Sequence, residues 1–204
     1  DEGEIRADRV IVSCGGAAGT KVGGVTDGYE LLKPLGHKCT KIRPSLVQLI
    51  TDPTYPRALK GVRVNAKTAL ECGGSIVAES EGELQFTETG VSGPAAFDIS
   101  RAASENGRGV IHIDLSGGAD IEGKLRSRVA ANPELGAEDI LTGVLHSRLG
   151  KMVVKYARVG GGKPIGELSG NELAAIARSC RDFELELRGV EDLAHAQVTA
   201  GGIR

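Results

Sequence analysis

The sequence predicts an α+β fold in which an antiparallel β-barrel-like module is joined to a small helical bundle. Three observations lead to this prediction. From His37 to about Leu115, apolar and polar residues alternate in short runs that turn-forming residues separate. The pattern takes a helical period between Ala119 and Cys180. Alternation then returns at residues 183–188, so the β module encloses the helical module in sequence.

The first expected elements are a strand and a short helix. Residues 4–12 alternate and end at a turn that contains Gly15 and Gly16, which indicates a strand followed by a glycine-rich turn. Thr26 is a suitable N-cap for a short helix that reaches Leu32. Gly36 supplies the residue that follows the end of that helix.

The β module is expected to consist of short strands connected by tight turns. These strands cover residues 37–42, 45–50, 61–66, 68–72, 75–79, 82–87 and 110–115. Gly73-Gly74 is the clearest two-residue hairpin. One helix interrupts the strands: it begins with Pro94 as its first residue, runs to about Ala103, and is expected to bury Ala96, Ile99 and Ala103.

The helical module is expected to hold four helices. The first covers residues 120–131 and is stopped by Pro133, the second covers 137–149, and the third starts near Lys151. The last begins at Ser169, which forms a capping box with Glu172. Strands at 183–188 and 196–198 follow.

Composition excludes several classes of protein. The 204 residues are 40% hydrophobic and 25% charged with a net charge of −2, as in ordinary soluble globular proteins. No run reaches the roughly 18 apolar residues of a membrane span. The near-zero charge and the lack of Trp argue against nucleic acid as a partner. Four scattered cysteines and the absence of a signal peptide predict reduced thiols and a cytoplasmic location.

The two ends of the sequence predict a fragment of a larger protein. The chain has no initiator Met, since its single Met is Met152, and it opens directly on the alternating residues 4–12. It closes on Ala200-Gly201-Gly202-Ile203-Arg204 without a tail. A fragment of this kind carries only part of a functional site.

Two glycine clusters could form phosphate-binding or cofactor-binding turns. Gly15-Gly16 after an apolar strand could present backbone N–H groups to a phosphate or a flavin, or it could be a tight turn. The run of three glycines at 160–162 before Lys163 lacks the spacing of a phosphate loop, and a flexible connector is the favoured interpretation.

The polar residues leave the chemistry open. His112 and Asp114 share a strand face and could bind a metal or exchange a proton, but no further ligand lies at a suitable spacing, so we expect a solvated strand face and no metal site. The sequence shows no Ser-His-Asp or Cys-His arrangement for nucleophilic catalysis, and the catalytic residues stay unassigned.

One basic face could dock an anion. It carries four cations at helical spacing, namely Arg148, Lys151, Lys155 and Arg158. The favoured interpretation is the solvated side of an amphipathic helix.

Several stretches together resemble one family, the bacterial FAD-dependent flavoproteins known as aminoacetone oxidases or NAD(P)/FAD-dependent oxidoreductases. The stretches are S-C-G-G at 13–16, T-D-G-Y-E-L at 26–31, L-G-H at 35–37, R-P-S-L-V at 43–47, G-E-L-Q-F-T-E-T-G-V-S-G-P-A at 82–95, and A-Q-V-T-A-G-G-I at 196–203. The resemblance covers essentially the whole chain.

The resemblance implies a Rossmann-type FAD domain that carries the barrel and the helices as a long insertion. Remnants of the FAD-domain sheet would then stand at both ends of this chain. The expected divisions are 1–36 for the edge of the FAD-binding domain, 37–118 for the barrel-like module, 119–182 for the helical module, 183–195 for a returning strand, and 196–204 for the return to the FAD domain. We expect the two crossings, at Gly16 and at Gly201, to be neighbours.

The resemblance also implies the cofactor and its contacts. FAD would lie near Gly15, Gly16, Thr199, Gly201 and Gly202, and the partner of this chain would be the remainder of its own FAD-binding domain. The dinucleotide fingerprint G-x-G-x-x-G is absent, so the chain alone is not expected to retain FAD.

Departures from the family pattern concern the first loop. Ser13-Cys14 replace the usual Ala-Thr, and the stretch 17–29 lacks the aromatic residue and the proline that the family has near the start of this stretch, although it keeps the final Tyr29.

The expected function is that of an insert domain in an FAD-dependent oxidoreductase, where it covers the flavin and shapes the substrate side. The chain alone would be inactive. The alternative is a non-catalytic binding module that docks an anionic ligand or a partner on the basic face.

Overall fold

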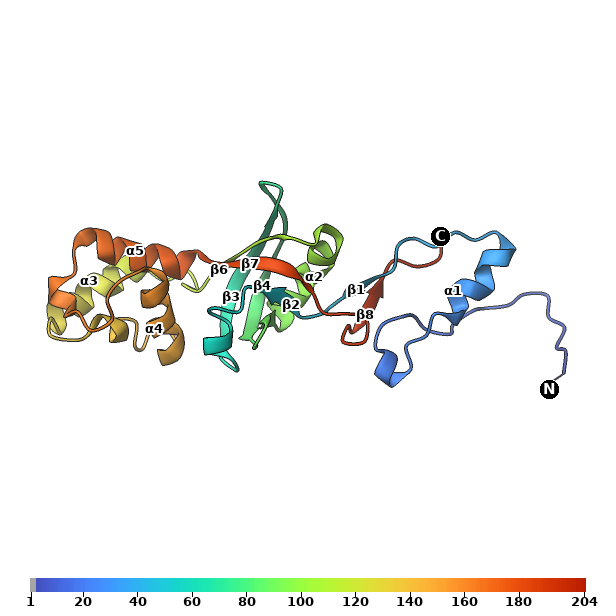
Figure 1. The fold of residues 1–204 in the computed structure, drawn as a ribbon, viewed down its shortest axis with the longest axis horizontal. Coiled ribbons are helices and arrows are strands. Elements are labelled where there is room, and N and C mark those ends of the chain that lie inside the picture. Colours follow the sequence, from blue (N-terminus) through green and yellow to red (C-terminus); the bar gives the residue numbers. More distant parts are fainter. Residues whose placement is uncertain (1–2) are drawn as a thin grey trace.

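The protein is elongated, with three parts in a row. A computed structural model describes residues 3–204, so Asp1 and Glu2 of the expected 1–36 segment lie outside the described residues. Figure 1 shows the helices α3, α4 and α5 at one end, a β-barrel in the centre, and the segments that hold both chain termini at the other end. The expected α+β class with a closed barrel is confirmed.

The central barrel has six strands that follow one another in the order β2-β5-β4-β3-β6-β7, with every neighbouring pair antiparallel. The strands are β2 (Leu49–Thr51), β3 (Arg63–Cys72), β4 (Ser75–Phe86), β5 (Gly90–Ser92), β6 (Gly109–Asp114) and β7 (Phe183–Val190). Alternate residues face inward, and the aromatic rings of Phe86 and Phe183 are fully buried there. The alternation in the sequence is therefore the inside–outside alternation of a barrel wall.

The longest hairpin joins strands that the sequence divides into shorter ones. The expected strands 61–66 and 68–72 form the single strand β3, while 75–79 and 82–87 merge into β4. Thr68 continues β3 because its side chain is buried and its hydroxyl donates to the carbonyl of Ala95 at 3.2 Å. The hairpin at Gly73 and Gly74 is confirmed, and both residues have positive φ, of 60° and 81°.

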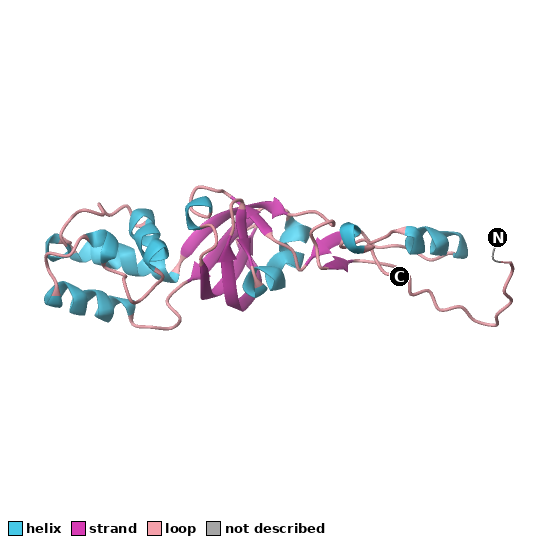
Figure 2. Ribbon diagram, turned by 90° about the horizontal axis from the view of Figure 1, so that it is seen from below, coloured by secondary structure: helices cyan, strands magenta, loops and turns pink. Residues whose placement is uncertain are grey.

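Helix α2 (Pro94–Asn106) packs against the barrel wall (Figure 2). It begins at Pro94 as expected, and Ala96, Ile99 and Ala103 are all buried, so this prediction is confirmed. Gly82 faces the start of the helix, where an added Cβ would stand 3.8 Å from the Pro94 side chain. The start of α2 therefore lies one van der Waals contact away from β4 at this position.

The helical module contains α3 (Ile121–Ala131), α4 (Ser147–Tyr156) and α5 (Gly170–Arg181), with 3-10 turns η4 (Ala137–Asp139) and η5 (Ile165–Glu167). The expected helix over 137–149 is wrong. Gly143 has φ of 80°, which interrupts a right-handed helix. The chain forms only the short turn η4 at the start of this range, before the irregular residues around Gly143. The expected third helix is α4, which begins at Ser147, before the expected start near Lys151. The capping box of Ser169 and Glu172 is confirmed at the start of α5.

The terminal segments meet in a small second sheet. Strand β1 (Arg43–Ser45) pairs antiparallel with β8 (Val198–Ala200), so that Arg43 lies opposite Ala200. The expected strand 45–50 is divided between β1 and β2, because Leu46 has φ of 50°. The remaining short elements are η1 (Thr20–Val22), α1 (Asp27–Leu32), η2 (Lys33–Leu35) and η3 (Arg57–Leu59).

Two expected strands do not form. Residues 4–12 make no strand in the described chain, and Ile5 and Ile11 are 88% and 90% exposed. The expected strand 37–42 is reduced to one isolated bridge between Cys39 and Ile203. A strand needs a neighbour to accept and donate its ladder hydrogen bonds, and no neighbouring strand is present beside residues 4–12 among the described residues.

Candidate functional site

A glycine-lined pocket lies where the first and last segments of the chain meet. It is an open cavity of about 380 Å³, and its lining comes from residues near both ends of the sequence. These residues are Gly16, Ala18, Tyr29, Gln197, Val198, Thr199 and Gly201. We call it the terminal pocket. The expectation that the two crossings at Gly16 and Gly201 are neighbours is confirmed.

Backbone hydrogen bonds hold the two walls of the terminal pocket together. The N–H of Ala18 donates to the hydroxyl oxygen of Thr199 at 2.8 Å, and the N–H of Gly19 donates to the carbonyl of Leu193 at 2.8 Å. Thr199 belongs to β8, which pairs with β1 next to the barrel. The barrel therefore positions the last segment, and the last segment positions the first glycine-rich loop.

Gly16 is tightly bordered by two side chains on the side where a Cβ would stand. A Cβ built on Gly16 would lie 3.1 Å from the hydroxyl of Tyr29 and 3.2 Å from the hydroxyl of Thr199. Both distances are shorter than ordinary van der Waals contact, so a side chain here would force its neighbours apart. Gly16 thus exposes backbone between two hydroxyl groups, an arrangement suited to a ligand that approaches the main chain closely.

Gly201 and Gly202 have a different geometry. Gly201 has φ of 88°, and a Cβ there would collide with the carbonyl of Lys41, so only glycine fits. Gly202 donates its N–H to the hydroxyl of Thr40 at 2.9 Å, and its carbonyl accepts the N–H of Thr40 at 2.8 Å. These bonds tie the last residues to the segment before β1.

The structure brings together part of the sequence-predicted site. Gly16, Thr199 and Gly201 line the terminal pocket, whereas Gly15 adjoins it and Gly202 is held by the neighbouring segment. Whether any of the five contacts a cofactor stays a prediction. Sequence reasoning did not select Tyr29 or Gln197 as site residues, although Tyr29 stands in the T-D-G-Y stretch that carried the resemblance.

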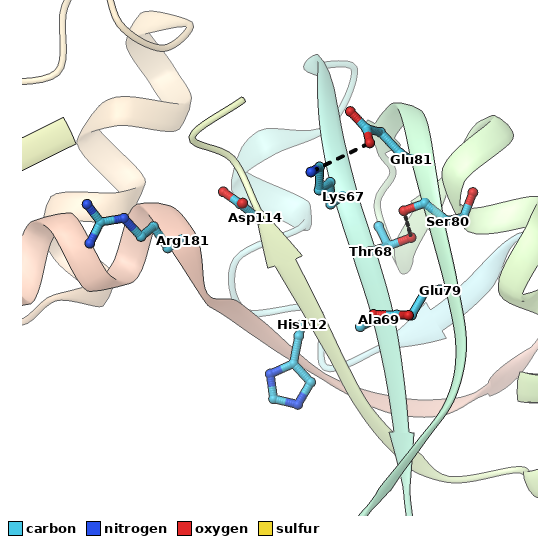
Figure 3. Close-up of a pocket in the computed structure, with 9 residues that line it drawn as sticks. All are labelled: Lys67, Thr68, Ala69, Glu79, Ser80, Glu81, His112, Asp114 and Arg181. Atoms are coloured by element: carbon cyan, nitrogen blue, oxygen red, sulfur yellow. Dashed lines mark hydrogen bonds and ion pairs between the residues drawn. The ribbon is translucent and has the colours of Figure 1, made fainter. Parts of the chain in front are cut away.

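His112 lies in a different environment from the one the sequence indicated. Asp114 accepts the N–H of Ser116 at 2.7 Å instead of pairing with His112. Both line an open cavity of about 430 Å³ on the outside of the barrel, and the His112 ring points away from the residues drawn around it (Figure 3). The partners of His112 come from other elements, because Asp182 is 70 positions away in sequence.

The basic face is less continuous than its spacing predicts. Helix α4 ends at Tyr156, and Arg158 follows it with φ of 58°, so Arg158 does not continue the helical face. Arg148 donates to the carbonyl of Ala58 at 2.7 Å, and Lys151 is 3.1 Å from Glu138. Half of the proposed anion-docking cations are thus already engaged within the protein.

Two of the four thiols are poor nucleophiles. Burial raises the pKa of the Cys180 thiol to about 12, and burial also raises the pKa of Cys72. A thiol with a raised pKa stays protonated at neutral pH, and the thiolate is the nucleophilic form. Covalent chemistry at these two cysteines is therefore disfavoured.

No helix within residues 3–204 has the length and apolar character needed to cross a bilayer.

The architecture defines a class of protein domain: a closed six-stranded barrel with a helical bundle inserted between β6 and β7, entered and left through the paired strands β1 and β8. Residues 43–198 match the model of the HI0933-like protein barrel and H2TH domain, a range that runs from the first residue of β1 to the first residue of β8. Since the match covers more than half of the chain, the protein belongs to the HI0933-like family. The resemblance to the bacterial flavoprotein family is thereby confirmed.

Curated relatives extend over almost the whole chain. A 3-dehydro-bile acid delta(4,6)-reductase of Clostridium scindens is 29% identical over 205 residues, covering 97% of this chain and 50% of the relative. Ribosomal RNA dihydrouridine synthases of Haemophilus influenzae and Escherichia coli are 25% and 24% identical, covering 95% and 98% of this chain and 47% and 49% of each relative. The chain spans about half the length of the curated relatives it matches.

Proposed function

We propose that this chain is the substrate-side part of an FAD-dependent oxidoreductase that adds hydrogen to its substrate. The barrel and the helical module cover the flavin, while the terminal segments complete the edge of the FAD-binding domain. The observation that carries this proposal is the terminal pocket, in which Gly16 presents bare backbone between the hydroxyls of Tyr29 and Thr199.

The relatives support the reaction class. One relative is named as a reductase and two are named as synthases of a dihydro base, so each name describes the addition of hydrogen to an organic substrate. A bile acid and an RNA base differ greatly in size and polarity. We infer that the hydrogen-adding half-reaction is the shared property, and that the part of the protein facing the substrate varies between relatives.

The terminal pocket fits a portion of FAD. Its volume of about 380 Å³ is at the small end for a ligand site, so it would take one segment of the cofactor while the rest lies against another part of the protein. The hydroxyls of Tyr29 and Thr199 border the Cβ position of Gly16, which explains glycine here, and the bare backbone stays open to close approach by the cofactor. The ADP part requires a dinucleotide fingerprint, which this chain lacks.

The residues of the pocket would bind and orient the cofactor. The hydroxyls of Tyr29 and Thr199 can donate hydrogen bonds to carbonyl or ring-nitrogen acceptors, and Thr199 at the same time fixes the loop through the N–H of Ala18. When bound, the flavin supplies the hydride chemistry, and the protein supplies binding, orientation and electrostatics. On the barrel side of the pocket, pairing with β1 holds Thr199 in place opposite Pro44.

We also propose that the remainder of the FAD-binding domain covers residues 4–36. Large apolar side chains are exposed along this segment: Ile5, Val10, Ile11, Val22, Leu31 and Leu35 are each more than 60% exposed. The alternating residues 4–12 would then gain a neighbouring strand and form the strand that their pattern predicts. A cytoplasmic location belongs to the same proposal, since all four cysteines are free.

The test is the flavin content of the full-length polypeptide encoded by the gene. The expected result is one FAD per polypeptide, identified by its visible absorbance and by chromatography after denaturation, and bleaching of that absorbance by a reduced nicotinamide under anaerobic conditions. Full-length protein that folds cooperatively yet binds no flavin would refute the proposal.

A further inference from the structure

A cluster of one imidazole and three carboxylates lies on the outer face of the barrel, away from the terminal pocket. His112 on β6 stands directly across from Glu184 on β7, and the neighbouring strand β3 contributes Glu71. Asp182 is the single residue between the end of α5 and the start of β7. We call these four residues the His112 cluster.

The distances place the carboxylates on both sides of the imidazole ring. The Nδ1 atom of His112 is 2.8 Å from an oxygen of Asp182 and 3.8 Å from an oxygen of Glu184. The Nε2 atom is 3.4 Å from an oxygen of Glu71 and is itself shielded from solvent. The side chain of His112 is 26% exposed, so the ring is held against the barrel wall with one edge accessible.

The cluster carries negative charge that the described residues do not neutralise. Within residues 3–204, the ion pairs of Glu71, Asp182 and Glu184 all run to His112, and none of the three has a Lys or Arg partner within 4.0 Å. Other acids on the barrel surface do have such partners, for example Glu83 with Arg63. Like charges on adjacent strands destabilise a sheet, so this arrangement calls for a cation.

The orientation of the imidazole selects the side on which the cation sits. Nδ1 is the ring nitrogen that faces both Asp182 and Glu184, and its N–H donates to Asp182 at 2.8 Å, so a metal ion would take the place of that proton. On the far side of the ring, Glu71 lies 3.4 Å from Nε2. A carboxylate that accepts from the far nitrogen of a ligating histidine is the usual support of a protein metal ligand. The ligand atoms of His112, Asp182 and Glu184 all lie within 4.8 Å of one another.

We propose that His112 Nδ1, Asp182 and Glu184 bind a divalent transition-metal ion of the Zn²⁺ class, with Glu71 as the residue that orients the imidazole. One nitrogen and two carboxylate oxygens suit such an ion, whose bonds to these atoms are about 2.0–2.2 Å. Mg²⁺ is a poor fit because it prefers an octahedral set of oxygens.

The ion would act as a clamp at the junction between the two modules. Asp182 ends the helical module, whereas His112 and Glu184 belong to barrel strands. A second contact at this junction is the bond from the N–H of Leu115 to the carbonyl of Cys180 at 2.7 Å. Coordination would therefore fix the end of α5 relative to β6 and reduce bending between the helices and the barrel.

The test is calorimetric titration of the metal-free protein with Zn²⁺ at neutral pH, with Mg²⁺ titrated in parallel. The expected result is one Zn²⁺ per chain, at least tenfold weaker binding of Mg²⁺, and loss of saturable Zn²⁺ binding in His112→Gln. Glu71→Gln should weaken binding about 10- to 100-fold while leaving the stoichiometry at one. Zn²⁺ should also raise the midpoint of thermal unfolding of the unmodified protein but not of His112→Gln.

The matched control is His195→Gln. His195 is 2.8 Å from Asp192 and 3.8 Å from Glu191, so it offers similar groups on a single loop. This variant should bind Zn²⁺ as the unmodified protein does. Equal Zn²⁺ affinity in His112→Gln and the unmodified protein, or a cluster that takes up only a proton and no Zn²⁺, would overturn the proposal.

Discussion

Replacing Ile99 with Ala tests the packing of α2 against the barrel. Ile99 is fully buried, and the change removes three carbon atoms from the core that the barrel and the helical module share. At about 0.8 kcal/mol per buried methylene, the transfer loss is about 2.4 kcal/mol, and the residual cavity raises the total toward the upper end of about 2–5 kcal/mol. For a chain of this size, the midpoint of thermal unfolding should fall by about 5–20 °C.

The assay is urea unfolding followed by circular dichroism, with Ile99→Ala compared with Glu105→Ala on the same helix. Glu105 is exposed and forms a surface pair with Arg101 at 3.2 Å, so its removal should change the free energy of unfolding by about 0.5 kcal/mol or less. Ile99→Ala should lower the denaturation midpoint without changing the slope. A loss below about 1 kcal/mol would show that α2 is not an integral part of the core.

Three further outcomes are expected. The 204-residue chain alone should purify colourless and show no saturable FAD binding by calorimetry; a yellow preparation with stoichiometric flavin would contradict this. Hydrogen bonds from Lys163 and Ser169 lower the pKa of Glu172 from 4.5 to about 2, so its stabilising effect is present above pH 4.5 and is lost as the pH falls toward 2. Acid-unfolding curves of Glu172→Gln and the unmodified protein should therefore converge near pH 2, and a constant difference would contradict this. Thr199→Val should speed amide exchange at Ala18, which loses its acceptor; unchanged exchange would show that this bond does not hold the loop.

Elements with local signals were predictable from sequence. Pro94 with a preceding glycine marks the start of α2, the Gly73-Gly74 pair marks a hairpin, and the Ser169 capping box marks the start of α5. Each signal depends only on backbone conformation within a few residues, so the rest of the fold does not alter it.

Elements that depend on distant neighbours were not predictable. The helix expected over 137–149 is a separate case with a local cause, because Gly143 with its positive φ breaks it. Residues 4–12 have the pattern of a strand but lack a neighbouring strand among the described residues. The carboxylates around His112 were not predictable, because Glu71 comes from β3, Asp182 from the α5–β7 junction and Glu184 from β7, and only the closed barrel brings them together.

The candidate site was partly predictable because glycine requirements are visible in sequence. Gly16 and Gly201 could be selected from motifs, since both positions exclude a side chain. Tyr29 was quoted as part of a motif but not as a site residue, because its position beside Gly16 depends on how α1 folds back on the first loop.

Flavin occupancy of a Gly16→Val variant in the full-length polypeptide tests the central claim most directly. Valine places its side chain where a Cβ alone would stand 3.1 Å from the Tyr29 hydroxyl and 3.2 Å from the Thr199 hydroxyl, so it displaces two groups that line the terminal pocket. Gly160→Val is the matched control, because no atom lies within 4 Å of a Cβ at that position. We predict that Gly16→Val loses most of its FAD while Gly160→Val retains one FAD per chain. Full occupancy in a folded Gly16→Val variant would contradict the assignment of the terminal pocket to the flavin.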